Sequence, residues 1–226
     1  MQQPPLRAVI FDMDGVLIDS EPMWQQAEFN ILGALGLPVT PEAIAQTTGL
    51  RIDEVAQYWQ QRCPAQHLQS RDIEDDIIAE VIQSIRRDGQ AMSGVSHALQ
   101  ACRLQGLKVG LATSSSSDII EAVLEKLHIR DAFDAIQSAE SLPLGKPHPE
   151  VYLRCAQRLQ VNPDACLAVE DSFNGMIAAR AAKMQTLVIP AEVQWNAAHW
   201  SAAQHKLPSL QALPALLAQL AGTRAP

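Results

Sequence analysis

Several features that would indicate other classes of protein are scarce or absent in this sequence. Aromatic residues make up only 4% of it, and it contains no long basic stretch. No apolar run approaches the ~20 residues that a membrane-spanning helix needs. The formal net charge of −8 also disfavours nucleic-acid binding. We therefore expect neither a nucleic acid nor a membrane as partner.

The cysteines form no C-x-x-C pair: Cys63, Cys102, Cys155 and Cys166. A chain of 226 residues can bury a sizeable core without disulfide bonds, so we expect reduced, buried thiols. The first apolar stretch stops at Asp12, and the preceding MQQPPLR has no hydrophobic signal-peptide region. These features predict a cytoplasmic protein.

Hydrophobic residues, mainly Ala, Leu, Val and Ile, make up 47% of the sequence, which suits helices packed on a parallel sheet. Short apolar runs that end in polar residues predict strands at 8–11, 107–112, 133–136, 166–169 and 185–189. Helical patterns occupy 118–127, 149–159, 175–183 and 210–220. This alternation predicts an α/β fold with a Rossmann-like doubly wound parallel sheet, whose ligands bind beyond the carboxyl ends of the strands.

Residues 19–92 do not follow the alternation. Helical patterns cover 22–35, 52–62 and 72–87, and Pro41 after Thr40 marks another helix start. We therefore expect an all-helical domain at 19–92, inserted into a core domain formed by 1–18 and 93–226.

Pairs of carboxylates follow two of the predicted strands. Asp12 and Asp14 could share a cation or divide nucleophilic and acid/base work, although a polar turn would have the same sequence. Glu170 and Asp171 could bind a metal ion, or they could cap the helix near Gly175.

A hydroxyl and a cation lie in similar positions. Thr113, Ser114 and Ser115 follow a predicted strand, where hydroxyl and backbone N–H groups can hold phosphate oxygens or begin a helix. Lys146 is either a phosphate ligand or a solvated loop residue. Two acid pairs, a hydroxyl and a lysine at the same edge of one sheet together favour phosphoryl transfer, which depends on positioning and charge neutralisation.

Four ordered segments resemble the motifs of the haloacid dehalogenase (HAD) superfamily: VIFDMDGVLIDSEP, Thr113 after LA, Lys146-Pro147 and VEDSFNGM. The resemblance spans about residues 7 to 190. The helical segment resembles the C1-type cap of the β-phosphoglucomutase-like subfamily. Within that subfamily, DSEPMW and TTGLRIDEV are similar to segments of the bacterial 2-deoxyglucose-6-phosphate phosphatases, or hexitol phosphatases.

This resemblance implies a Mg²⁺-dependent phosphatase that acts on hexose or hexitol phosphates in carbohydrate metabolism. Asp12 would become an aspartyl phosphate, and Asp14 would protonate the leaving oxygen and then activate water. Mg²⁺, with Mn²⁺ or Co²⁺ as substitutes, would be held by Asp12, the Asp14 backbone carbonyl and Asp171, with Glu170 supporting or coordinating.

The resemblance also assigns substrate contacts. Thr113, Lys146 and the backbone N–H of Ser114 would bind the phosphoryl group, and Arg51 of the cap would reach the sugar or the phosphate. Trp24 either lines the entrance or packs the first cap helix. The expected partner is a small phosphorylated metabolite, and the expected state is a monomer.

A sugar-phosphate mutase with the same core is the main alternative. β-Phosphoglucomutases of this subfamily carry a histidine near the position of Trp24, whereas no histidine occurs between Asp14 and Leu50 here, which favours a hydrolase. Dehalogenases lack an acid at the position of Asp14. A phospho-acceptor signalling domain would not need the helical insert, and a non-catalytic binding module would have no reason to carry both Asp12 and Asp14.

Overall fold

The protein is built on one sheet of six parallel strands in the order β3-β2-β1-β4-β5-β6. The computed structural model describes residues 4–64 and 69–222. The strands are β1 (Ala8–Phe11), β2 (Lys108–Thr113), β3 (Ala135–Ser138), β4 (Cys166–Glu170), β5 (Gln185–Val188) and β6 (His205–Lys206). The predicted doubly wound parallel sheet is confirmed.

Strand β1 lies in the middle of the sheet. Its four residues are all buried, and it pairs in parallel with β2 on one side and β4 on the other. In the register of the sheet, Phe11 pairs with Leu111 of β2 and with Val169 of β4. Because all three strands run in the same direction, the residues that follow them meet at one edge of the sheet.

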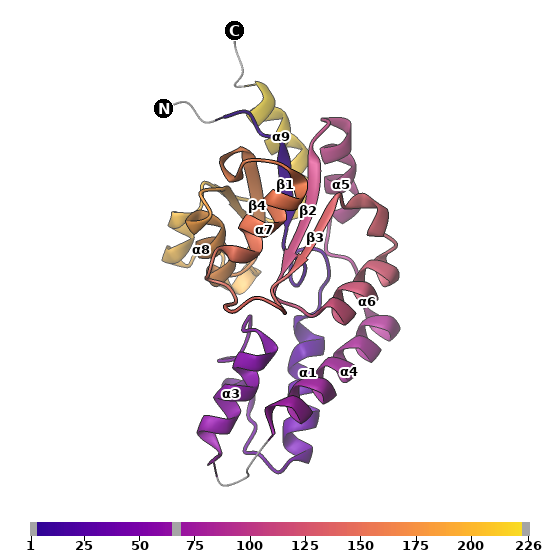
Figure 1. The fold of residues 1–226 in the computed structure, drawn as a ribbon, viewed down its shortest axis with the longest axis vertical. Coiled ribbons are helices and arrows are strands. Elements are labelled where there is room, and N and C mark those ends of the chain that lie inside the picture. The colour runs from indigo at the N-terminus through magenta and orange to yellow at the C-terminus, as the bar shows by residue number, and fades with distance from the viewer. Residues whose placement is uncertain (1–3, 65–68, 223–226) are drawn as a thin grey trace.

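Helices cover both faces of the sheet (Figure 1). One face packs against α5 (Val95–Leu104), α6 (Ser117–Leu127) and α9 (Leu213–Gly222), and the other against α7 (Glu150–Leu159) and α8 (Phe173–Ala181). Side chains of β1 alternate between these layers, with Val9 and Phe11 on the first face and Ala8 and Ile10 on the second. In the described residues, no helix has the length and apolar character needed to cross a bilayer.

The four cysteines are free thiols and are all buried. Burial raises the pKa of Cys102, Cys155 and Cys166 to about 12, so these thiols stay protonated and are poor nucleophiles. The expectation of reduced, buried thiols is confirmed.

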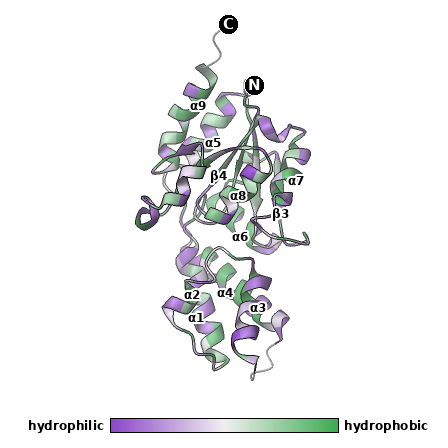
Figure 2. Cartoon of the chain, turned by 90° about the vertical axis from the view of Figure 1, so that its left-hand side faces the viewer, coloured by the Kyte–Doolittle hydropathy of each residue, from purple (hydrophilic) through white to green (hydrophobic). Residues whose placement is uncertain are grey.

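In the part of the chain that the structure describes, the segment between β1 and α5 contains four α-helices, which we call the helical insert (residues 21–88): α1 (Glu21–Ala34), α2 (Pro41–Ile44), α3 (Ile52–Arg62) and α4 (Ser70–Asp88). They lie together beyond the end of the sheet at which β1 finishes, and each of α1, α3 and α4 carries both hydrophobic and hydrophilic residues (Figures 1 and 2). Their shared interior includes Trp59, Ile77 and Val81. The all-helical character that the sequence predicts for this segment is confirmed.

The insert also holds a buried carboxylate on α1. Glu28 is only 4% exposed, and the Thr47 hydroxyl donates a hydrogen bond to its Oε2 at 2.8 Å. Burial raises the pKa of Glu28 from its ordinary 4.5 to about 7, although the hydrogen bond from Thr47 acts in the opposite direction. The folded protein therefore holds this proton more tightly than the unfolded chain does, and this contribution to stability is lost as pH rises from about 4.5 to 7.

Replacing Glu28 with glutamine should remove this pH dependence. At pH 8 the substitution should increase the free energy of unfolding by about 2 kcal/mol, because a buried charge is replaced by a neutral amide of similar shape. At pH 5 the change should be much smaller. Urea denaturation at the two pH values measures both effects, with Glu125→Gln at an exposed position of α6 as the control. Equal effects of Glu28→Gln at both pH values would contradict the expectation.

Candidate active site

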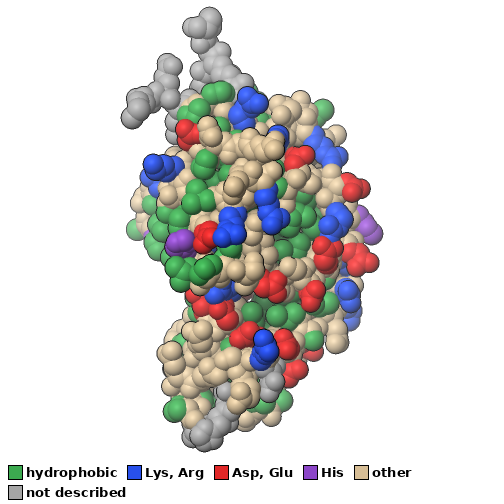
Figure 3. Space-filling view, in the orientation of Figure 1, with side chains coloured by type: hydrophobic (Ala, Val, Ile, Leu, Met, Phe, Trp, Pro, Cys, Tyr) green, Lys and Arg blue, Asp and Glu red, His purple; other side chains and the backbone are tan. Residues whose placement is uncertain are grey.

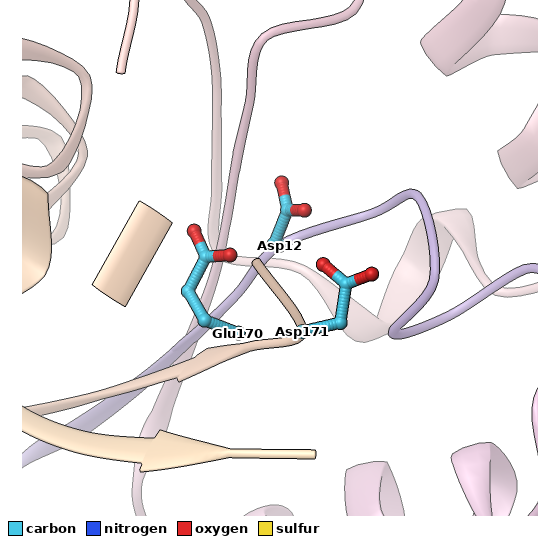
Figure 4. Close-up of side chains that lie close together, drawn as sticks. All are labelled: Asp12, Glu170 and Asp171. Atoms are coloured by element: carbon cyan, nitrogen blue, oxygen red, sulfur yellow. The ribbon is translucent and has the colours of Figure 1, made fainter. Parts of the chain in front are cut away.

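Three carboxylates converge where β1 and β4 end. Asp12 follows β1, Glu170 is the last residue of β4, and Asp171 comes next. One carboxylate oxygen from each residue lies within 4.8 Å of the corresponding oxygens of the other two. The three carboxylates point to the same side (Figure 4). In the space-filling view, acidic side chains gather near the junction between the sheet and the helical insert (Figure 3). Three of the four acids that the sequence singles out therefore lie in one cluster.

Lys146 reaches this acidic cluster from the loop before α7. Its Nζ donates hydrogen bonds to Asp12 Oδ1 at 2.8 Å, Glu170 Oε1 at 2.6 Å and the Ala112 carbonyl at 3.2 Å. The residue is 7% exposed. Burial alone would lower the pKa of Lys146, but the two carboxylates raise it well above its usual value. Lys146 is therefore a fixed positive charge beside Asp12.

Glu170 is fully buried and holds Lys146 in place. Tyr152 of α7 donates its hydroxyl hydrogen to Oε1, and the Ser172 hydroxyl donates to Oε2 at 3.2 Å. Burial, followed by the nearby carboxylates, raises the pKa of Tyr152 far above its usual value, so the phenol remains a donor. A Cβ atom at Gly175 would lie 2.0 Å from Glu170 Cδ, so α8 approaches the carboxylate too closely for any larger residue.

Asp14 lies two residues after Asp12 and has a different set of partners. Its Oδ1 accepts hydrogen bonds from Ser20 Oγ at 2.5 Å and Trp24 Nε1 at 3.2 Å, and its Oδ2 accepts one from Ser115 Oγ at 2.6 Å. All three donors are neutral. The two aspartates of the loop are thus in different environments, one beside an ammonium group and the other among neutral donors.

Asp12 and Asp171 are the carboxylates that best suit a cation. Burial raises the pKa of Asp12 to about 7, and Lys146 offsets only part of this effect. Burial, together with Asp12 and Glu170, raises the pKa of Asp171 well above its usual value. Among the described residues Asp171 has no hydrogen-bond partner, and a Cβ atom at Gly15 would lie 2.0 Å from its Oδ2. Oxygen ligands with an excess of negative charge fit Mg²⁺, which would favour the ionised carboxylates.

The end of β2 contributes Thr113 to the same edge, and the loop after it contributes Ser114. Thr113 is buried, and its Oγ1 accepts a hydrogen bond from the Ser115 backbone N–H at 3.1 Å. Ser114 is half-buried beside it. The structure therefore brings both residues close to Lys146, because Lys146 Nζ donates a hydrogen bond to the carbonyl of Ala112, the residue just before Thr113. Their contacts with a phosphoryl group remain predictions.

Arg51 joins the helical insert to the core, where a Cβ atom at Gly145, the neighbour of Lys146, would lie 3.6 Å from its side chain. Its guanidinium group pairs with Asp53, with both N–O distances 2.6 Å. Its Nη1 donates to the carbonyl oxygens of Ala139 at 3.1 Å and Leu142 at 2.8 Å, in the loop after β3. A role for Arg51 in holding substrate remains a prediction, and its contacts here connect the insert to the core.

Sequence reasoning did not single out Ser20 and Tyr152, and it left open whether Trp24 packs or lines the site. It picked out Ser115 only as a member of Thr113-Ser114-Ser115, a candidate phosphate-binding segment, and not as a partner of Asp14. Ser20 and Trp24 are four residues apart at the start of α1, the spacing that places two side chains on one helix face. That spacing was a usable signal. For Tyr152 there was no signal, because it has the pattern of a core residue.

A parallel α/β sheet with a buried lysine and clustered acids beyond its central strands has the architecture of an enzyme. Residues 6–183 match the family model described as haloacid dehalogenase-like hydrolase, and the chain belongs to this family. It is therefore a hydrolase, and the activity that its relatives indicate is that of a phosphatase.

Two relatives and one solved structure illustrate the similarity. The chain is 44% identical over 209 residues to hexitol phosphatase B of Escherichia coli K12, covering 92% of this chain and 94% of that protein. It is 31% identical over 183 residues to a fructose-1-phosphate phosphatase of the same organism, covering 79% and 94%. A β-phosphoglucomutase from Clostridium difficile has the same fold, with a TM-score of 0.83 at 22% identity over 96% of this chain and 98% of that chain.

Proposed function

We propose that the protein is a Mg²⁺-dependent phosphatase that hydrolyses small sugar phosphates through an aspartyl phosphate on Asp12. The observation that carries the proposal is the contrast between two carboxylates on one loop. Lys146 lies 2.8 Å from Asp12, whereas three neutral groups donate to Asp14. Such a contrast suits a nucleophile next to an acid/base. The similarity to hexitol phosphatase B supports hexose or hexitol phosphates, 2-deoxyglucose 6-phosphate among them, as substrates.

In the first step Asp12 attacks phosphorus, the bond between phosphorus and the sugar oxygen breaks, and Asp14 gives its proton to that oxygen. In the second step water attacks the aspartyl phosphate, Asp14 takes a proton from the water, and Asp12 is released as a carboxylate. Lys146, Thr113 and the backbone N–H of Ser114 bind the phosphoryl oxygens. In both steps negative charge on the phosphoryl oxygens lies near Lys146. A buried ammonium group stabilises this charge more strongly than water would.

Asp12, Asp171 and the Asp14 backbone carbonyl would hold the Mg²⁺ ion, with Mn²⁺ or Co²⁺ as substitutes. Glu170 supports this set indirectly, because both of its oxygens already accept hydrogen bonds. The metal would neutralise charge on the phosphoryl oxygens.

Residues 19–92 would act as a cap that covers the substrate and excludes water, while 1–18 and 93–226 form the core domain. Two observations support this role. Trp24 of α1 reaches Asp14, and Arg51 reaches the core carbonyls of Ala139 and Leu142. The cap would then select among small phosphorylated metabolites, and the enzyme would work as a cytoplasmic monomer.

A panel of sugar phosphates tests the proposal directly. Hexose and hexitol phosphates should release inorganic phosphate in the presence of Mg²⁺, and activity should fall to background when EDTA removes the metal and return when Mg²⁺ is restored. Glucose phosphates separate the proposal from the mutase alternative, because a mutase would form the isomeric phosphate without free phosphate. Absence of phosphate release across the panel with Mg²⁺, Mn²⁺ and Co²⁺ would refute the proposal.

A further inference from the structure

Two of the three hydrogen-bond donors to Asp14 lie at the start of α1. Ser20 is the N-cap residue just before this helix, but its hydroxyl makes no capping bond to the helix backbone and donates to Asp14 instead. Trp24, one turn later, donates its indole N–H to the same oxygen, Oδ1. The third donor, Ser115, comes from the loop after β2 and binds Oδ2. The two oxygens of Asp14 therefore have different partners.

These partners also differ in what they can do when Asp14 carries a proton. A serine hydroxyl can rotate and either donate or accept, so Ser20 and Ser115 can adjust to a protonated carboxyl group. An indole N–H can only donate. A proton on Oδ1 would have to point to Ser20 while the same oxygen still accepts from Trp24 Nε1, and a protonated carboxyl oxygen is a poorer acceptor than the carbonyl oxygen. A proton on Oδ2 would meet only Ser115, whose hydroxyl can turn to accept it, and would leave Oδ1 as the carbonyl oxygen that accepts from Trp24.

We propose that Trp24 is a positioning residue for Asp14, which keeps Oδ1 as an acceptor and so places the transferable proton on Oδ2. This inference rests on the proposed function of Asp14 as acid/base. In the first step the proton leaves Oδ2 for the sugar oxygen as the phosphorus–oxygen bond breaks. Asp14 is then a carboxylate, to which all three donors can bind. In the second step the proton from water returns to Oδ2.

The alternative is that Trp24 only packs. Its ring is half-buried and contacts the hydrophobic core, so its removal could affect activity through the fold alone. The two roles differ in how the effect depends on the leaving group. A sugar oxygen needs a proton as it leaves, whereas p-nitrophenolate leaves without one. The value of kcat/KM is the appropriate measure, because it includes the steps up to loss of the first product and excludes the later attack by water.

Trp24→Phe keeps an aromatic ring and removes the N–H donor. We expect kcat/KM for 2-deoxyglucose 6-phosphate to fall about tenfold, the size expected for one lost hydrogen bond to a charged group. The kcat/KM for p-nitrophenyl phosphate should fall less than about twofold, and the midpoint of thermal unfolding should be close to that of the wild type. Asp14→Asn should change the ratio of the two kcat/KM values in the same direction and by a larger factor.

Trp59→Phe is the matched control within the same insert. Trp59 is fully buried on α3, and its Nε1 has no hydrogen-bond partner among the described residues. This variant should leave the ratio of the two kcat/KM values unchanged, whatever it does to stability. An equal loss on both substrates in Trp24→Phe, or no loss on either, would overturn the inference. Failure of the wild-type enzyme to hydrolyse either ester would instead reject the proposed function.

Discussion

Replacing Asp12 with asparagine should reduce the turnover of phosphate esters to background, a loss of at least about 10⁴-fold in kcat. The amide has nearly the same shape as the carboxylate but cannot attack phosphorus. Because burial raises the pKa of Asp12 to about 7, a neutral group at this position should cost the fold little. We therefore expect loss of activity with an unchanged or slightly higher midpoint of thermal unfolding.

Acid-quenched wild-type protein should also carry a phosphoryl adduct that intact-protein mass spectrometry detects, and Asp12→Asn should carry none. Asp19→Asn is the matched control, since it makes the same chemical change at an exposed position seven residues further along. It should retain turnover and form the adduct. Wild-type turnover by Asp12→Asn would mean that another residue is the nucleophile.

The secondary structure at the centre of the fold could be predicted closely from the sequence. Strand β1 and helix α3 have the predicted bounds, 8–11 and 52–62, because polar and charged residues interrupt the apolar patterns there. Strand β2 extends to Thr113, one residue beyond the predicted end. Hydrogen bonding to β3, in which Thr113 pairs with Ser138, causes the difference, and a hydropathy pattern does not contain that information.

Helix α5 and strand β6 were not predicted. Helix α5 has apolar residues at helical spacing, Val95, Ala98, Leu99 and Cys102, and could have been found from that pattern. Strand β6 could not, because it consists of His205 and Lys206 alone and forms by pairing with β5 at the sheet edge. A two-residue polar segment carries no periodic signal.

The acidic cluster could be predicted because it depends only on strand ends. Asp12 and Glu170 meet since β1 and β4 are parallel neighbours, and Lys146 joins them through a single loop. The partners of Asp14 depend instead on how α1 sits against the sheet and on which serine of Ser114–Ser117 turns inward. Both are tertiary features. The sequence therefore specifies the charged groups of the site better than it specifies the neutral groups that orient them.

Replacing Lys146 with methionine should affect both activity and stability. Lys146 is the ammonium group that lies between Asp12 and Glu170, and Glu170 is fully buried. Removing one partner of a buried ion pair leaves an uncompensated charge and typically costs about 3–5 kcal/mol. We expect a loss of this size in the free energy of unfolding by urea at pH 8 without divalent cations, and a fall of at least about 10³-fold in kcat/KM. Lys183→Met, the same change at an exposed position, should alter neither.

The double variant Lys146→Met/Glu170→Gln separates the two effects. Glutamine removes the negative charge of Glu170, and its amide oxygen can still accept the hydrogen bond from Tyr152. The Ser172 hydroxyl can rotate to accept from the amide NH2 group, so most of the lost stability should return. Activity should not return, because the cation that faces the phosphoryl group is still missing. A double variant as unstable as Lys146→Met would show that the charge of Glu170 is not the source of the instability. Recovery of turnover in the double variant would show that Lys146 serves only to neutralise Glu170 and takes no part in binding the phosphoryl group.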